Sequence, residues 1–179
     1  MASLGERMVG AIRADVATFE EIERDPTALG QAVTVIVLAG VASLIGNIFR
    51  NGLTMGVMFL LATLIGYAIW TVLVVVIGTK LMPEPSTKAG FQEGFRVIGF
   101  AASPGVFNVL AIIPFLGPVI SFFISIWMLV VMVIAVRSVL DYTSTGRAIV
   151  VCLIGMVVYW IINFAILMPL LVGRAILYG

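Results

Sequence analysis

The chain has no histidine and a single cysteine, Cys152, among its 179 residues. One cysteine cannot form a disulfide within the chain. Metal sites of the usual histidine and cysteine kinds are excluded for the same reason. The candidate nucleophiles Ser103, Ser121, Ser125 and Cys152 have no histidine that could serve as a base. We therefore expect a protein that is not an enzyme and that uses no cofactor or metal.

Charge is scarce as well. Charged residues make up 11% of the chain and hydrophobic residues 62%, and the mean hydropathy is +1.22. Soluble domains carry about 25% charged residues, so the composition predicts an all-α, polytopic membrane protein. The net charge is +1 and no basic patch is present, which argues against a nucleic-acid partner.

The longest uncharged run covers residues 97–136. A bilayer core needs about 20 helical residues, so this run is long enough to cross twice. The place to turn is Pro114-Phe-Leu-Gly-Pro118, with Gly117 beside the second proline. Pro118 also suits the first turn of the helix that follows. The run therefore predicts a third and a fourth span joined by this turn.

We expect a transmembrane domain over residues 28–172 with five spans. Arg50-Asn51-Gly52 supplies the tight turn between the first two spans. Phe91 and Phe95, one helical turn apart, predict a short amphipathic piece before the third span. Pro104 lies near the middle of the third span, where proline kinks a helix, and Gly105 loosens it further. The expected spans are residues 28–49, 53–79, 96–113, 118–136 and 148–172.

Residues 1–25 predict one N-terminal amphipathic helix that ends before Pro26. Its apolar residues recur at helical steps, and such a helix suits the membrane interface. Its charges sum to −3, however, from three arginines and six acids. Docking on the protein's own loops, or on a partner, therefore remains as good an interpretation as lying on lipid. The apolar face would consist of Leu4, Met8, Ile12, Val16, Phe19 and Ile22, and the acids Glu20, Glu21, Glu23 and Asp25 are interpreted as a solvated face.

Lysine and arginine counts predict the sidedness. With the N-terminus inside, eight of these residues fall in inside segments and two, Arg50 and Arg174, in outside segments. We expect a prokaryotic plasma (inner) membrane protein with a cytoplasmic N-terminus and an outside C-terminus. The middles of the expected spans contain no aspartate, glutamate, lysine, arginine or histidine, which argues against a proton-coupled pump. A passive pore for a neutral solute remains open.

Few polar residues are candidates for a site. Arg137, Asp141 and Arg147 should gather at the inner face, as an interfacial anchor with a loop ion pair or as a site for a partner or lipid headgroup. Pro104-Gly105 could be a static kink or a broken-helix site of the transporter kind. Tyr67 and Trp127 fall in the middle of spans, which favours packing within the bundle. Three amides within or near spans could join helices by hydrogen bonds or line a solute path, namely Asn47, Asn108 and Asn163.

Three stretches carry a resemblance to a known family: RVIGFAASPGVFNVL, IIPFLGPVISFFISIWMLVVMVIAVR and STGRAIVVCLIG, within Gly94–Gly155. The chain resembles the Yip (Ypt-interacting protein) family in its short prokaryotic, five-span form. The resemblance implies a membrane domain like that of eukaryotic members, which are implicated in vesicle traffic, Rab-type GTPase binding and membrane shaping. Their longer cytosolic N-terminal region is missing here, so we do not expect a Rab-type GTPase partner.

The sequence thus predicts a non-enzymatic scaffold or accessory subunit. Its expected partners are membrane lipids and either another membrane protein or a second copy of the chain. The alternative is a small-solute channel or transporter subunit that uses Pro104-Gly105 and the amides in the spans. The residues interpreted as determinants of shape or as interaction sites are Pro104, Gly105, Asn108, Pro114, Gly117, Pro118, Arg137, Asp141 and Arg147.

Overall fold

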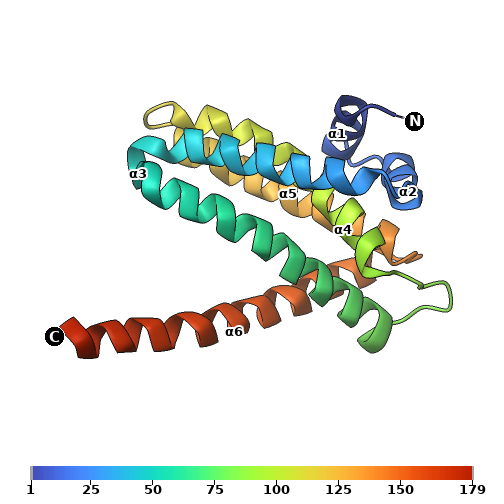
Figure 1. Cartoon of the computed structure of the whole chain (residues 1–179). Coiled ribbons are helices and arrows are strands. Elements are labelled where there is room, and N and C mark those ends of the chain that lie inside the picture. Colours follow the sequence, from blue (N-terminus) through green and yellow to red (C-terminus); the bar gives the residue numbers. More distant parts are fainter. Residues whose placement is uncertain (1, 179) are drawn as a thin grey trace.

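The computed structural model describes the backbone of residues 2–178 and their side chains apart from those of 51, 163 and 165–178. Helices dominate this part of the chain, and long helices run side by side (Figure 1). The elements are α1 (Leu4–Ile12), α2 (Val16–Arg24), α3 (Ala28–Val76), a π-helical turn (Ile77–Leu81), α4 (Phe91–Phe100), a 3₁₀ segment η2 (Ser103–Ile112), α5 (Gly117–Val139) and α6 (Thr145–Tyr178).

Five helical segments are long and apolar enough to cross a membrane. Two of them belong to α3, which reverses direction at Gly52, where φ is 72°. A residue with a side chain rarely adopts such a φ, whereas glycine does so freely. The turn predicted at Arg50-Asn51-Gly52 is therefore confirmed, and so is the all-α class. The five segments in the described chain are Ala28–Arg50, Gly52–Leu81, Phe91–Ile112, Gly117–Val139 and Thr145–Ile162.

The N-terminal segment is two short helices, and the prediction of one helix over residues 1–25 is wrong. The chain turns at Ala14, where φ is 57°. The Asp15 side chain caps α2 by accepting the Thr18 N–H at 3.1 Å. A methyl group on Gly10 would overlap the Thr18 side chain, so the two helices pack closely where they meet. Each helix is too short to be stable alone in water, and packing decides where the chain folds back.

The apolar face of this helical pair belongs to the protein's own core. Ala11, Phe19 and Ile22 are fully buried, and Leu4 and Met8 pack against the same core. Figure 1 shows α1 and α2 against the bundle near the start of α3. Docking on the protein therefore describes most of this face, while Val16, also predicted to belong to it, is 41% exposed.

The third membrane-crossing segment differs from its prediction in start and in form. The helix α4 already begins at Phe91, so the short piece predicted around Phe91 and Phe95 is part of it. It ends at Phe100, and the chain continues from Ser103 as a 3₁₀ helix with Pro104 in its first turn. The predicted kink is thus a change of helix type that begins before the proline. Pro104 has no N–H to donate, and a first-turn position costs it no hydrogen bond.

The turn after η2 matches its prediction. Phe115 lies at its tip with φ of 65°, and the Leu116 N–H donates to the Pro114 carbonyl at 2.8 Å. Pro118 occupies the first turn of α5. Gly117 is required by space, because a methyl group there would overlap the Ala111 carbonyl oxygen. The end of η2 and the start of α5 therefore pack backbone against backbone at this turn.

Candidate functional site

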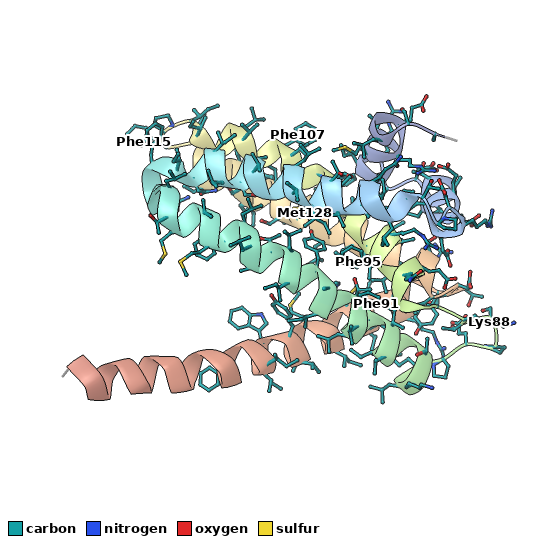
Figure 2. All side chains as sticks on the ribbon, in the orientation of Figure 1. Lys88, Phe91, Phe95, Phe107, Phe115 and Met128 are labelled. Atoms are coloured by element: carbon teal, nitrogen blue, oxygen red, sulfur yellow. The ribbon has the colours of Figure 1, made fainter. Side chains whose placement is uncertain are left out.

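Most polar contacts lie at one end of the bundle. Figure 2 places Lys88, in the loop before α4, and Phe115, in the turn before α5, at opposite ends. The Lys88 end also holds the helical pair α1–α2 and the connection from α5 to α6 (Figure 1). We describe this polar end first and the membrane-spanning part afterwards.

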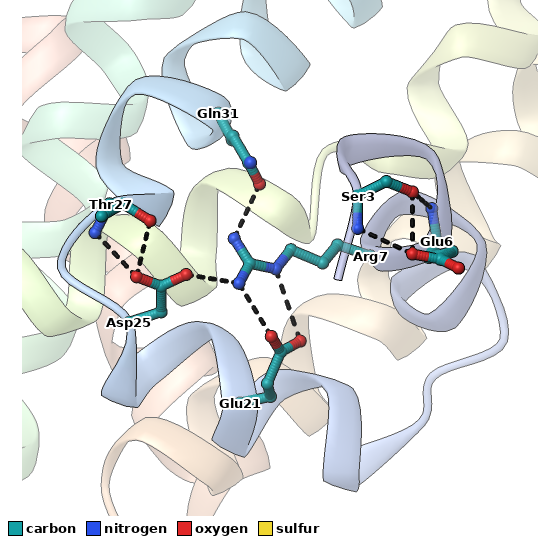
Figure 3. Close-up of polar contacts among 7 residues, drawn as sticks. All are labelled: Ser3, Glu6, Arg7, Glu21, Asp25, Thr27 and Gln31. Atoms are coloured by element: carbon teal, nitrogen blue, oxygen red, sulfur yellow. Dashed lines mark hydrogen bonds and ion pairs between the residues drawn. The ribbon is translucent and has the colours of Figure 1, made fainter. Parts of the chain in front are cut away.

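Arg7 is the centre of the polar end. Its side chain is only 1% exposed and lies among groups from α2 and α3 (Figure 3). Its Nη2 lies 2.8 Å from Glu21 Oε1 and 2.5 Å from Asp25 Oδ2, and its Nη1 donates to the Gln31 side chain at 2.8 Å. A buried charge needs this degree of pairing, because desolvation otherwise costs several kcal/mol.

The carboxylates around Arg7 are held in their ionised form. The hydrogen bond from Arg7 lowers the pKa of Glu21. The Thr27 hydroxyl, and then Arg7, lower the pKa of Asp25 to about 2. The sequence interpretation of these two acids as part of a solvated face is wrong for Asp25, whose side chain is 13% exposed, whereas Glu21 is 41% exposed and pairs with Arg7 from a partly solvated position. They form an ionic tie that joins α1, α2 and the start of α3.

A second arginine ties α4 to α2. Arg96 is 6% exposed, and its guanidinium donates to the backbone carbonyl of Glu23. Its Nε has no hydrogen-bond partner among the described residues. Burial, and then the negative charges of Asp141 and Glu93, together raise the pKa of the Glu23 carboxyl to about 7. The polar end thus contains a half-buried acid that titrates near neutral pH.

Hydrogen bonds join the two loops at this end, the one before α4 and the one between α5 and α6. Thr87 donates from its hydroxyl to the Leu140 carbonyl at 2.8 Å, and Ser86 does so to the Asp141 carbonyl at 3.1 Å. The Tyr142 hydroxyl donates to the Met82 carbonyl at 2.8 Å. These bonds fix the α5–α6 connection against the segment between the π turn and α4.

Glu84 adds a hydrogen bond and an ion pair between the same two loops. Its carboxylate accepts the Thr143 N–H at 3.1 Å and lies 3.4 Å from Arg147 Nη1. The loop ion pair predicted among Arg137, Asp141 and Arg147 is therefore made by Arg147 with a different residue. Glu84 was missed because it lies 59 residues before Thr143 in the chain, in a loop with two prolines, where spacing carries no signal of contact.

Arg137 and Asp141 shape the end of α5. Arg137 Nε donates to the Tyr142 carbonyl at 3.3 Å, and its Nη1 donates to the Thr145 hydroxyl at 3.2 Å. These bonds hold the connection between α5 and α6 against the last turn of α5. Asp141 has φ of 51°, so the chain turns sharply there. Within the described chain no ion pair joins these two residues, and their role toward a partner or lipid stays a prediction.

The other predicted residues lie in the membrane-spanning part. Pro104 and Gly105 are buried, and a methyl on Gly105 would come within 2.9 Å of the Ala39 side chain of α3. The Asn108 carbonyl oxygen lies where a methyl on Gly46 would be. The 3₁₀ segment is thus packed directly on α3. The structure does not bring these residues together with Arg137, Asp141 and Arg147.

Of the three amides interpreted from the sequence as helix-joining or path-lining groups, Asn47 has a hydrogen bond within its own helix. Asn47 donates to the Ser43 carbonyl at 3.0 Å, one turn back in its own helix. Asn108 contacts α3 through its backbone. The side chain of Asn163 lies outside the described residues. Hydrogen bonding between helices is therefore not the role of Asn47.

A cavity of about 380 Å³ lies between α3, α5 and α6. Sequence reasoning missed it and interpreted Tyr67, one of its lining residues, as bundle packing. The cavity lies where α6 diverges from the other helices (Figure 1). A local sequence pattern does not predict the angle between helices. Among the described residues no group of three histidine, cysteine, aspartate or glutamate side chains could hold a metal.

Five apolar helical segments, with their polar contacts concentrated at one end, define a polytopic helical membrane protein. A family model of the Yip1 domain matches residues 9–165. The chain therefore belongs to the Yip1 domain family, which confirms the resemblance and extends it well beyond Gly94–Gly155. No curated protein and no solved structure matches the chain.

Proposed function

We propose that the protein is a non-enzymatic membrane scaffold or accessory subunit that packs against another membrane protein or a second copy of itself. One observation carries the proposal: the ionic groups at the polar end are used to hold the fold together. Arg7 ties three helices, Arg96 ties α4 to α2, and Arg147 ties two loops. Groups engaged in this way support a fixed shape rather than chemistry on a substrate.

The outward surface of the spans supports the same proposal. On α5, Phe122 and Phe123 are 62% and 64% exposed, and their rings contact each other edge to face with centroids 5.7 Å apart. In a bilayer, such a surface faces lipid or another helix. Association between helices there depends on packing and shape, which a braced bundle supplies.

A solute path through Pro104-Gly105 has less support. A transporter site of that kind needs backbone groups that line a cavity. Here Gly105 packs on Ala39 and the Asn108 carbonyl packs on Gly46, so neighbouring helix fills the space. The proposed location is a prokaryotic plasma membrane with a cytoplasmic N-terminus, which the distribution of lysine and arginine supports.

One purification tests the proposal. The protein is solubilised in a mild detergent after brief cross-linking in the membrane, and co-purifying chains are identified by mass spectrometry. A stoichiometric membrane partner, or a cross-linked homo-oligomer, is the expected result. Lone protein that conducts a solute in liposomes would contradict the proposal if Asn108→Leu abolished the flux. Val109→Leu, on the same segment and 37% exposed, is the matched control.

A further inference from the structure

The cavity between α3, α5 and α6 lies at the middle of the membrane-spanning segments. On α3 its lining runs from Thr63 to Trp70, across the centre of Gly52–Leu81. On α5 it runs from Ser125 to Met132, across the centre of Gly117–Val139. The lining residues are Thr63, Gly66, Tyr67, Trp70, Ser125, Met128, Leu129, Met132, Cys152, Met156 and Tyr159. A molecule bound there would lie in the hydrocarbon core rather than at the headgroups.

The walls are apolar, polarisable and aromatic. Met128, Met132 and Met156 come from two helices, and methionine adapts its shape and makes favourable contacts with rings. Trp70 and Tyr159 meet edge to face with centroids 6.3 Å apart. Aromatic edges and faces of this kind favour a further flat ring. The volume of about 380 Å³ falls in the ~300–1,000 Å³ range of small-molecule sites.

Two hydroxyl groups of the lining donate hydrogen bonds within their own helices, and a third does not. Thr63 donates to the Phe59 carbonyl at 2.8 Å, and Ser125 donates to the Ser121 carbonyl at 2.7 Å, each within its own helix. The Tyr67 hydroxyl has no hydrogen-bond partner among the described residues. One turn further on, the buried Trp70 Nε1 has none either. A donor left unpaired away from water costs about 1–3 kcal/mol.

The Tyr67 hydroxyl favours a ligand from the bilayer that carries a hydrogen-bond acceptor. A phospholipid acyl chain carries no acceptor at this depth, because its ester oxygens lie near the interface, about 15 Å from the midplane. A charged molecule is excluded from the hydrocarbon by its desolvation cost. An uncharged ring that carries a carbonyl oxygen dissolves in the hydrocarbon and presents an acceptor there.

We propose that this cavity binds a neutral, lipid-soluble carbonyl compound with a flat ring, of the quinone class, whose carbonyl oxygen accepts a hydrogen bond from Tyr67. The ring lies among the methionine side chains, beside Trp70. The site goes beyond the scaffold function and does not depend on it, because a bound ring requires no partner chain.

Tryptophan fluorescence tests the proposal. The probe is a benzoquinone with a decyl tail, added to the full chain in phosphatidylcholine liposomes, because quinones quench tryptophan on contact. The chain has three tryptophans, so Trp127→Phe with Trp160→Phe leaves Trp70 as the reporter. The matched reference keeps only Trp160, which is 70% exposed on α6. We expect saturable quenching of Trp70 and non-saturable, collisional quenching of Trp160.

Three further arms identify the site. Ser125→Phe fills the cavity and should abolish the saturable component, whereas Ile126→Phe, on the neighbouring exposed position, should leave it. Met156→Phe fills the same space from α6 and is used if Ser125→Phe loses its helical circular dichroism. Tyr67→Phe should weaken binding about 2- to 12-fold, the equivalent of one hydrogen bond of about 0.5–1.5 kcal/mol.

The contrary results are equally definite. Decylbenzene has the ring and the tail without carbonyls, so it should compete poorly with the quinone probe. If it competed equally well, the site would bind any apolar ring and the proposal would be overturned. Non-saturable quenching of Trp70 would also overturn it. So would quenching that disappears when the protein is concentrated in the bilayer, since a second copy would then occupy the cavity.

Discussion

The guanidinium of Arg7 lies 2.8 Å from the carboxylate of Glu21, and the two residues belong to helices that neighbour each other only because the chain turns at Ala14. The same guanidinium also contacts Asp25 and Gln31. One buried side chain therefore fixes how the N-terminal pair of helices sits on the first membrane-spanning segment. The stability of that arrangement should depend on it.

Arg7→Ala should lower the free energy of unfolding by about 3 kcal/mol, because it leaves two carboxylates without their buried cation. Arg24→Ala is the matched control: Arg24 pairs with Glu20 on the surface, and the two side chains are 77% and 48% exposed. Such a pair contributes at most about 1 kcal/mol. Thermal unfolding in detergent, followed by circular dichroism, measures both. Equal losses for the two variants would show that the buried tie has no special role.

Glu23 should make stability depend on pH. Its pKa is about 7 in the folded protein, above the ordinary value of 4.5, through burial and the nearby Asp141 and Glu93, and despite Arg24 and Arg96. The fold therefore favours the protonated form. The stabilisation is complete below about pH 4.5 and is lost as the pH rises through 7, by at most about 3 kcal/mol at ~1.4 kcal/mol per unit.

Glu23→Gln should flatten this decline between pH 4.5 and 7. Asp25 does not interfere in that window, because its lowered pKa of about 2 removes stability only at lower pH, from the ordinary value of 3.8 downward. Glu20→Gln, a nearby exposed carboxylate, is the control and should keep the wild-type slope. Unfolding temperatures measured across the window decide the matter, and an unchanged slope in Glu23→Gln would refute the assignment.

The contact of α3 with η2 should respond sharply to volume. Gly46→Ala should cost about 1–3 kcal/mol, as overpacking does, because the new methyl meets the Asn108 carbonyl oxygen. Gly30→Ala, in the same helix with no atom within 4 Å of its added methyl, should gain up to about 1 kcal/mol from helix propensity. Unfolding measurements on the pair separate packing from propensity. A gain in Gly46→Ala would mean that η2 does not press on α3.

The parts of the fold that follow from length and turn chemistry could be predicted. Residues 97–136 exceed one span, and the Pro114–Pro118 turn and Gly52 are where the structure reverses. The break at Ala14 could not be predicted in this way, because alanine carries no turn signal. The Asp15 cap on Thr18 was the available clue. It was outweighed by an apolar pattern that runs through both helices.

The candidate site was harder to predict, because its contacts depend on which helices meet. Helical periodicity places Arg7 on a polar face, and only the return of α2 encloses it. Arg147 finds Glu84 rather than a neighbour in sequence. Tyr67 becomes a cavity residue because α6 diverges from α3. In each case the local pattern predicts the helix correctly but does not predict which residue or helix will lie beside it.

The arrangement of the polar end makes a prediction about sidedness. Arg96 binds the Glu23 carbonyl and Tyr142 binds the Met82 carbonyl, so the N-terminal helices and both loops must share one side of the membrane. Lysine and arginine counts predict that this side is the cytoplasm. Reporters fused after Pro85 and Tyr142 should therefore give an inside signal, and those after Gly52 and Gly179 an outside signal. An inside signal at Gly179 would contradict five spans, and opposite signals at Pro85 and Tyr142 would contradict the hydrogen bonds between the loops.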